Sequence, residues 1–388
     1  MSEHSPLGAS GAERWMECPG SYALLDALKL PTSDEADYAA NGTAAHDALA
    51  FCTEHQRDAW ELLGTKSLNG VEIDAEITNA IQPELDLRRE LLLDASSSAV
   101  QLIEYKIAAP EVHKHFMGTV DWALIDGDTM ELSDYKHGQG IVVEVEHNPQ
   151  IMYYAFGLLL SPLAEHVKLC RLRIHQPRIA WQSEPQLWEA SAAEILEWGN
   201  TVLVPAMLRA EIDKDLLPGH WCRFCPAKLV CPVLTGLFRA AAVANPQDIV
   251  NWSPEALALS YKHIEGVKHY TRALEAMAFT ILRRGVLVPD LKLVHKKANR
   301  VWREGADIEL SVRLGETAFS KPSLMGPAKV EKLGTEAKAL VKEWAFTPTS
   351  DLTVALASDP RVGVTVDPLA KSFADALANI GGEDVDTK

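Results

Sequence analysis

Two aspartates and a lysine near the middle of the chain have the types and spacing that metal-dependent phosphodiester hydrolysis needs. Asp121 ends a GTVD segment, and Asp134 and Lys136 follow in a DYK segment. Side chains alternate along a strand, so Asp134 and Lys136 share a face, and Asp121 on a partner strand can lie beside them. Mg²⁺ neutralises such carboxylates and keeps water for a substrate phosphate, whose charge a lysine can stabilise. Surface acids and a salt bridge on a hairpin are the alternative explanation.

Residues suited to binding metal or DNA flank this trio. His46 ends a GTAAH segment within residues 39–55, where apolar residues recur at helical spacing. Gln150 and Tyr154 follow the trio and lie one helical turn apart on one face. Taken singly, such residues more often belong to a core or to a polar helix face. The ordered combination with the trio is what indicates a site.

The trio requires neighbouring strands, and the sequence pattern predicts them. Strands are expected at residues 100–108, 117–125, 130–136, 141–145 and 167–175. The Asp126-Gly127-Asp128 turn joins the second and third strands as a hairpin. Helices are expected at residues 10–30, 39–55, within 58–94, 149–160 (with Pro149 in its first turn), 184–211 and 253–284. The predicted fold class is therefore α/β or α+β, with a mixed central sheet flanked by helices and a mostly helical C-terminal region.

A second group of chemically distinctive residues consists of cysteines. Three of the six form a C-x₂-C-x₅-C pattern at Cys222, Cys225 and Cys231. A metal ion or cluster needs four ligands, so the fourth must come from elsewhere. The candidates are Cys18, Cys52, Cys170 and His220. Spacing alone favours zinc, whereas Cys52 and Cys170 lie on predicted apolar faces and are expected to be ordinary buried thiols.

Composition limits the remaining classes of function. The chain has 388 residues and a formal net charge of −17, which argues against a basic nucleic-acid coat protein. Six cysteines are too few for a disulfide scaffold of this length. We find no apolar run long enough for a transmembrane helix and no secretory signal, so the expectation is a cytoplasmic protein without a membrane partner.

A basic segment in the C-terminal third reverses the overall charge. Residues 283–303 contain seven arginines and lysines and one aspartate. Lys296, Lys297 and Arg300 are therefore predicted to track DNA phosphates, with a solvated basic face as the alternative. The last residues, 381–388, are acidic and are expected to be disordered.

Two longer segments carry a resemblance to a known family. They are RWMECPGS at residues 14–21 and DYKHGQG at residues 134–140. Together with the motifs above they resemble the RecB-like branch of the PD-(D/E)XK nuclease superfamily. That branch includes the nuclease domains of RecB and AddB, the CRISPR-adaptation nucleases with an iron–sulfur cluster, and a family encoded in phages and prophages. The resemblance implies a nuclease domain with its cysteine cluster at residues 1–235, followed by a mostly helical region at 236–380.

The resemblance also implies roles for individual residues. The implied catalytic set is Glu104, Asp121, Asp134, Lys136, Gln150 and Tyr154. The implied metal ligands are His46, Asp121, Asp134 and Tyr135. For Glu104, which would match the acid of the first core strand, a salt bridge with Lys106 is the alternative.

The cysteines and the overall function follow from the same likeness. In the cluster nucleases one N-terminal cysteine joins three C-terminal cysteines around a [4Fe–4S] cluster. The matching set here is Cys18, Cys222, Cys225 and Cys231, with structural Zn²⁺ as the alternative. The implied function is a Mg²⁺- or Mn²⁺-dependent exonuclease acting on double-stranded DNA ends in phage recombination or replication, with DNA and a phage single-strand-binding or annealing protein as partners. The alternatives are a non-catalytic DNA-binding or scaffold subunit with this fold, and a zinc-stabilised interaction protein unrelated to DNA.

Overall fold

The structure, a computed structural model, describes residues 5–28, 37–138, 142–179, 184–243, 253–286, 288–289 and 291. The chain divides into two compact units, Met1–Leu274 and Glu275–Lys388. The division lies inside helix α11 (Ile264–Arg283), and the boundary predicted near residue 235 falls within the first unit. Lys296, Lys297, Arg300 and the acidic tail at 381–388 lie outside the described residues.

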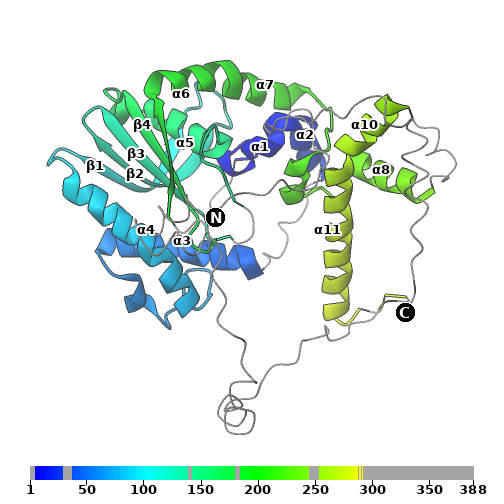
Figure 1. Ribbon diagram of the computed structural model, residues 1–388, viewed down its shortest axis with the longest axis horizontal. Coiled ribbons are helices and arrows are strands. Elements are labelled where there is room, and N and C mark those ends of the chain that lie inside the picture. Colours follow the sequence, from blue (N-terminus) through cyan, green and yellow to red (C-terminus); the bar gives the residue numbers. More distant parts are fainter. Residues whose placement is uncertain are drawn as a thin grey trace, which may run out of the picture. The chain divides into compact units, whose positions relative to one another are not determined.

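A five-stranded sheet forms the centre of the first unit. Its strands, in spatial order, are β1 (Val100–Ala108), β2 (Met117–Asp126), β3 (Thr129–Tyr135), β4 (Leu169–His175) and β5 (Gln186–Ser191). β3 and β4 are parallel, whereas the other neighbouring pairs are antiparallel. This mixed sheet with flanking helices confirms the predicted fold class (Figure 1).

Helices cover both faces of the sheet. One core lies between the sheet and α1 (Ala12–Glu17), α5 (Pro149–Leu159), α6 (Ala192–Trp198) and α7 (Val204–Ile212). A smaller core on the other face joins Tyr135 to α3 (Asp37–His55) and α4 (Ala75–Asp94). The remaining described α-helices are α2 (Gly20–Leu28), α8 (Pro232–Val243), α10 (Pro254–Lys262) and α11. The short 3₁₀ helices are η1 (Ala9–Gly11), η2 (Ala59–Leu62), η3 (Pro162–Ala164) and η5 (His220–Phe224), and the π-helical segment η4 (Gly199–Leu203) continues α6 into α7.

Local sequence signals explain the segments that lead into the site. Gly127 adopts a φ of 59° in the turn between β2 and β3, a backbone conformation that glycine tolerates best. The predicted hairpin is confirmed by this turn and by the β2–β3 ladder. The Asn148 side chain accepts the Gln150 N–H at 2.9 Å and so caps α5, with Pro149 at its first position, as predicted.

Two predicted elements are wrong. The segment expected to begin a helix at residue 184 first forms β5, and the helix starts only after Ser191, whose hydroxyl and Glu194 form a capping box. Residues 142–145 are irregular instead of a strand. There the Val143 N–H donates to the Gln176 side chain, and the Val143 carbonyl accepts from the Gln186 amide. Side chains therefore take the backbone bonds that a strand partner would have taken.

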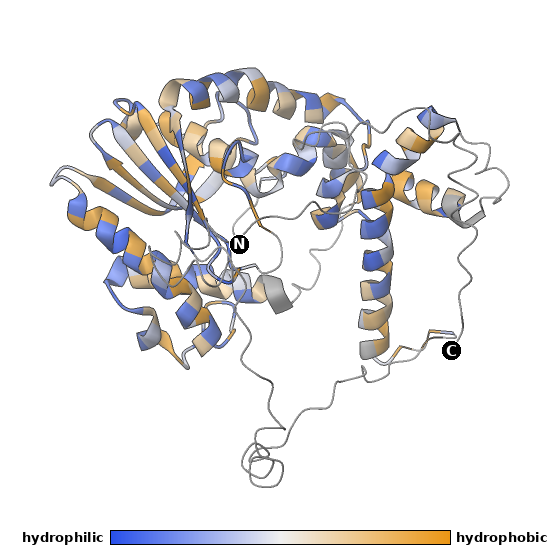
Figure 2. Ribbon diagram, viewed as in Figure 1, coloured by the Kyte–Doolittle hydropathy of each residue, from blue (hydrophilic) through white to orange (hydrophobic). Residues whose placement is uncertain are grey.

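Hydrophobic and hydrophilic residues share the surfaces of the long helices. Figure 2 shows both kinds along α4 and α11. Among the described helices, none combines the length and the apolar character needed to cross a membrane.

Candidate metal centre and cysteine site

Three acidic residues lie side by side across three strands. The register of β1 and β2 on either side places Glu104 opposite Asp121, although these two residues are skipped by the ladder itself. The ladder between β2 and β3 ends at Trp122 and Ser133, and its register one residue further brings Asp121 beside Asp134. Glu104 on β1 thus adds a third acid to the predicted group of Asp121, Asp134 and Lys136.

The alternation of side chains breaks at this row. Leu102 and Ile107 on β1 both pack in the core beside α5, although regular alternation would put them on opposite faces. Between them Glu104 has a φ of 45°, a left-handed conformation that is uncommon outside glycine. β2 changes face in the same way between Val120 and Ala123. The facing acids therefore lie at a kink that both strands share.

His46 on α3 completes a group of possible metal ligands. His46, Glu104 and Asp121 each offer one ligand atom within 4.8 Å of the others. His46 Nδ1 lies 3.4 Å from Asp121 Oδ2, and the Tyr135 backbone N–H donates to the same oxygen at 3.0 Å. Although part of its side chain is exposed, loss of hydration raises the pKa of Glu104 to about 7, and the Asp121 charge adds to the rise. Two carboxylates and an imidazole are a donor set that suits a divalent cation.

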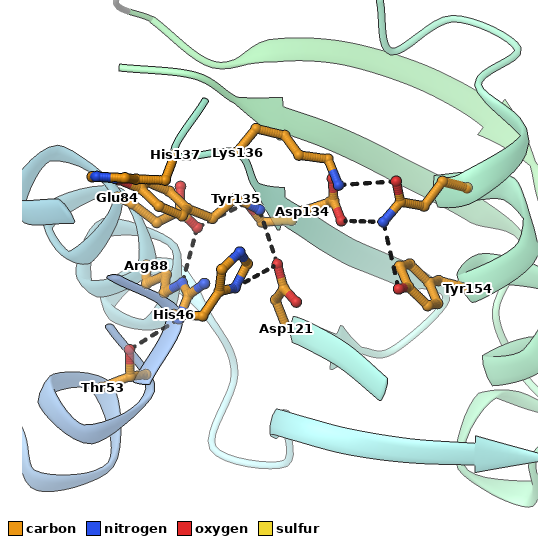
Figure 3. A network of polar contacts seen from close by, with 12 residues as sticks. His46, Thr53, Glu84, Arg88, Asp121, Asp134, Tyr135, Lys136, His137 and Tyr154 are labelled. Carbon is orange, nitrogen blue, oxygen red and sulfur yellow. Dashed lines mark hydrogen bonds and ion pairs between the residues drawn. The ribbon is translucent and has the colours of Figure 1, made fainter. Parts of the chain in front are cut away.

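Asp134 belongs to a second polar group, which faces α5 (Figure 3). Lys136 Nζ lies 2.8 Å from Asp134 Oδ2 and donates to Gln150 Oε1 at 2.9 Å. Gln150 Nε2 in turn donates to Asp134 Oδ1 at 3.2 Å and to the Tyr154 hydroxyl at 3.5 Å. Burial raises the pKa of Asp134, Lys136 opposes the rise, and Asp121 adds to it. The lysine is therefore held by a closed ring of three side chains.

The structure thus divides the predicted residues between two neighbouring groups. Asp134 is absent from the group of described ligand atoms within 4.8 Å, and its two oxygens face Lys136 and Gln150 instead. The Tyr135 ring is fully buried, and its backbone N–H is the part that reaches Asp121. Metal binding by Asp134 and Tyr135 stays a prediction.

The sequence prediction missed a buried ion pair next to the site. Glu84 and Arg88 on α4 pair through Glu84 Oε1 and Arg88 Nε at 2.9 Å, and both are almost completely buried. A signal was present, because they continue the helical spacing of the buried residues Ile77 and Ile81. Charged residues on such an apolar stripe indicate a buried pair.

The four cysteines implied by the resemblance come together. Cys18, Cys222, Cys225 and Cys231 are buried, have free thiols and line the same cavity. The Leu217 N–H donates to Cys18 Sγ at 3.3 Å, and the Gly219 N–H lies 3.5 Å from Cys222 Sγ. Burial is the main reason that the pKa of Cys222 rises to about 11. Ionised thiols at these positions therefore need a positive partner, which a bound metal supplies.

The other candidates for the fourth ligand are engaged elsewhere. Cys52 is buried between α3 and α4, and Cys170 is buried in the core of the sheet. His220 Nε2 lies 2.7 Å from Glu13 Oε1, in a largely exposed pair. Cys18 is the candidate that lines the cavity with the other three cysteines.

Comparison with known proteins gives a family. The family model described as "Protein of unknown function (DUF2800)" matches residues 4–362. The chain therefore belongs to the DUF2800 family. A solved structure, "Crystal structure of SSO0001", aligns with 55% of this chain and 94% of its own, at 14% sequence identity and a TM-score of 0.20. A TM-score this low establishes neither a shared fold nor a function.

Proposed function

We propose that this DUF2800 protein is a metal-dependent deoxyribonuclease of the RecB-like PD-(D/E)XK type, acting as an exonuclease on double-stranded DNA ends in phage recombination or replication. The observation that carries the proposal is the row of Glu104, Asp121 and Asp134 across three strands, with His46 on one side and Lys136 on the other. An incidental surface salt bridge does not require a strained backbone and four converging segments.

His46, Glu104 and Asp121 are the residues that would hold the cation. A divalent ion there supplies Lewis acidity toward a phosphodiester and a charge that neutralises the phosphate. Carboxylates suit Mg²⁺ and Mn²⁺, whereas an imidazole ligand is more common with transition metals. We therefore expect Mn²⁺ to bind more tightly than Mg²⁺.

The neighbouring group supplies a positioned cation. Asp134 and Gln150 hold the Lys136 ammonium in place. The lysine side chain therefore loses little further conformational freedom when a phosphate binds beside it. A fixed positive charge beside the cation stabilises the charge that develops on the phosphate. Tyr154 supports the Gln150 amide from within α5.

We further propose a [4Fe–4S] cluster at the four cysteines. Its support is that Cys18, Cys222, Cys225 and Cys231 line one cavity, with one N-terminal and three C-terminal cysteines as in the cluster nucleases that the sequence resembles. Structural Zn²⁺ is the alternative. Free thiols in all six cysteines agree with a reducing compartment, and we place the protein in the cytoplasm.

The direct test of the proposed function is cleavage of end-labelled linear DNA and of closed circular DNA. We expect degradation of the linear substrate in Mn²⁺ or Mg²⁺, none in EDTA, and little action on the circle. Absence of cleavage with either ion, on protein that binds Mn²⁺, would leave a non-catalytic DNA-binding subunit as the better description. A phage single-strand-binding or annealing protein is the partner we propose for the full reaction.

Lys136→Met is expected to lower cleavage by about a hundredfold to a thousandfold, the usual effect of removing one electrostatic group from a transition state. Mn²⁺ affinity should change little, because a protonated lysine is not a metal ligand and Lys136 Nζ instead contacts Asp134 and Gln150. Calorimetry and single-turnover cleavage measure the two effects separately. Lys106→Met, on the exposed side of β1, is the matched control and should cut normally. Equal loss in both variants would contradict the role of Lys136.

The basic segment gives a prediction about DNA affinity. Neutralising Lys296, Lys297 and Arg300 should weaken DNA binding and reduce the slope of log K against log salt by about one unit per lost phosphate contact. Cleavage at saturating DNA should be unchanged. A salt slope equal to that of the unaltered protein would make this segment an ordinary solvated surface.

A further inference from the structure

The buried ion pair on α4 contacts several segments that carry site residues. Glu84 Oε1 accepts from Ser133 Oγ at 2.8 Å, and Glu84 Oε2 lies 2.8 Å from His175 Nδ1. Burial alone would raise the pKa of Glu84, but Arg88, His175 and Ser133 outweigh it and hold the pKa at about 2. The carboxylate is therefore charged and fully engaged.

The two residues that Glu84 contacts are next to Asp134 and Lys136, one in sequence and one through a backbone hydrogen bond. Ser133 precedes Asp134 on β3. The carbonyl of His175 accepts the backbone N–H of Lys136 at 2.9 Å. One Glu84 carboxylate thus bonds to residues on both strands that fix the lysine and its aspartate.

Arg88 extends the network to the metal side of the site. Its Nη1 donates to Thr53 Oγ1 at 3.0 Å, and Thr53 lies two helical turns beyond His46 on the same face of α3. Its guanidinium carbon lies 5.6 Å from the centre of the Trp122 ring, next to Asp121 on β2. Figure 3 shows Thr53, Arg88 and Glu84 on the α3–α4 side of the site residues.

The residue types include those of a hydrolytic triad, but the geometry excludes one. In such a triad the histidine lies between serine and carboxylate, whereas here Glu84 lies between Ser133 and His175. All three are at most 1% exposed, so a substrate does not reach them.

We infer that the Glu84–Arg88 ion pair is a positioning element, which sets the distance between the metal ligands on α3 and β2 and the Asp134–Lys136 pair on β3. The inference rests on the proposed metal site. Groups that orient metal ligands from behind commonly change metal affinity or activity by about tenfold to a hundredfold when removed. Burying two charges without such a role has no advantage over packing apolar side chains in their place.

The test replaces the whole pair, because a single change would leave one buried charge without its partner. Glu84→Leu/Arg88→Met should fold, with a melting temperature lowered by several degrees because buried Ser133 and His175 each lose their bond to Glu84. Its Mn²⁺ affinity should fall by about tenfold to a hundredfold. Its kcat on DNA should fall while KM stays nearly constant, since the buried pair does not touch DNA. Calorimetry, circular dichroism and single-turnover cleavage supply these readouts.

The matched control is a second buried ion pair, which joins β3 and β4, the two strands that the Glu84 carboxylate contacts through Ser133 and His175. Glu131 on β3 pairs with Arg173 on β4, two residues before Ser133 and His175 respectively. Glu131→Leu/Arg173→Met should keep both Mn²⁺ affinity and kcat. Equal behaviour of the two double variants would overturn the inference and leave the metal site intact. An unaltered protein that binds no Mn²⁺ would instead overturn the proposed metal site, and the inference with it.

A milder variant covers the case in which the double variant does not fold. Thr53→Val removes only the hydroxyl that meets Arg88 and nearly conserves side-chain volume. We expect a severalfold loss of Mn²⁺ affinity, and Thr53→Ser should restore it because serine keeps the hydroxyl. Unchanged affinity in Thr53→Val, with the fold intact, counts against the positioning role of Arg88.

Discussion

Asp121→Asn is expected to remove the divalent-cation site and to lower DNA cleavage by more than about a thousandfold. Asp121 links the possible metal ligands on α3 to strand β3, since its Oδ2 lies 3.4 Å from His46 Nδ1 and accepts the Tyr135 N–H. The amide replaces a charge without changing shape, so packing is preserved. A bound cation stabilises the transition state by several kcal/mol, and each ~1.4 kcal/mol is tenfold in rate. Mn²⁺ calorimetry and cleavage of end-labelled DNA measure the two losses.

The control for this variant lies at the other end of the same hairpin. Asp128 is exposed in the turn and pairs only loosely with Lys168, at 3.6 Å. Asp128→Asn removes the same charge from the protein without touching the site, so binding and cleavage should remain normal. If Asp121→Asn still bound Mn²⁺ and cut DNA, the cation site would have to lie elsewhere.

Variants of Glu104 and Asp134 test which carboxylate binds the metal. The resemblance implies Asp134 as a ligand, whereas the structure groups Glu104 with His46 and Asp121. Glu104→Gln should lose Mn²⁺ affinity, because its carboxylate is within 4.8 Å of His46 and Asp121 ligand atoms. Asp134→Asn should lose cleavage with a smaller change in affinity, because its oxygens face Lys136 and Gln150. The opposite ranking of Mn²⁺ affinities would restore Asp134 as the principal ligand.

The sequence predicted the parts of the site that local rules determine. Alternation and the Asp126-Gly127-Asp128 turn were enough to bring Asp121 near Asp134. The asparagine cap and proline of α5 were enough to aim Gln150 at the sheet. These features depend on residues close together in the chain, so their pattern is visible before folding.

The features that the sequence did not reveal depend on distant neighbours. The kink at Glu104 breaks alternation on two strands at once, which no period within one strand predicts. β5 was missed because Gln186–Ser191 is a half-exposed edge strand, defined by pairing with β4 rather than by its own apolar pattern. Glu84 and Arg88, four residues apart, look like an ordinary surface pair until the rest of the buried stripe is considered.

Protein purified without oxygen is expected to be brown, with about four iron and four sulfide per chain, if the cluster is [4Fe–4S]. Cys18→Ser should lose the colour as completely as Cys225→Ser, because both thiols line the same cavity although they are remote in sequence. Cys52→Ser and Cys170→Ser should keep it, since each packs in a different core. His220→Ala should also keep it, because that ring pairs with Glu13. Iron analysis and absorption spectra measure all of these variants.

Loss of the cluster should also loosen the fold. Cys18 precedes α2, whereas Cys222, Cys225 and Cys231 follow α7, so the cluster closes a very long loop between the first helices and the segment that leaves the sheet. By analogy with covalent links that close long loops, its removal should cost several kcal/mol of stability. The first consequence should be proteolysis near residues 218–232, measured as a rate and compared between Cys18→Ser and Cys52→Ser. Stoichiometric zinc without iron in the anaerobic protein would favour the zinc alternative. A Cys18→Ser protein that stays brown would require a fourth ligand other than Cys18, even though Cys18 lies in the cavity with the other three.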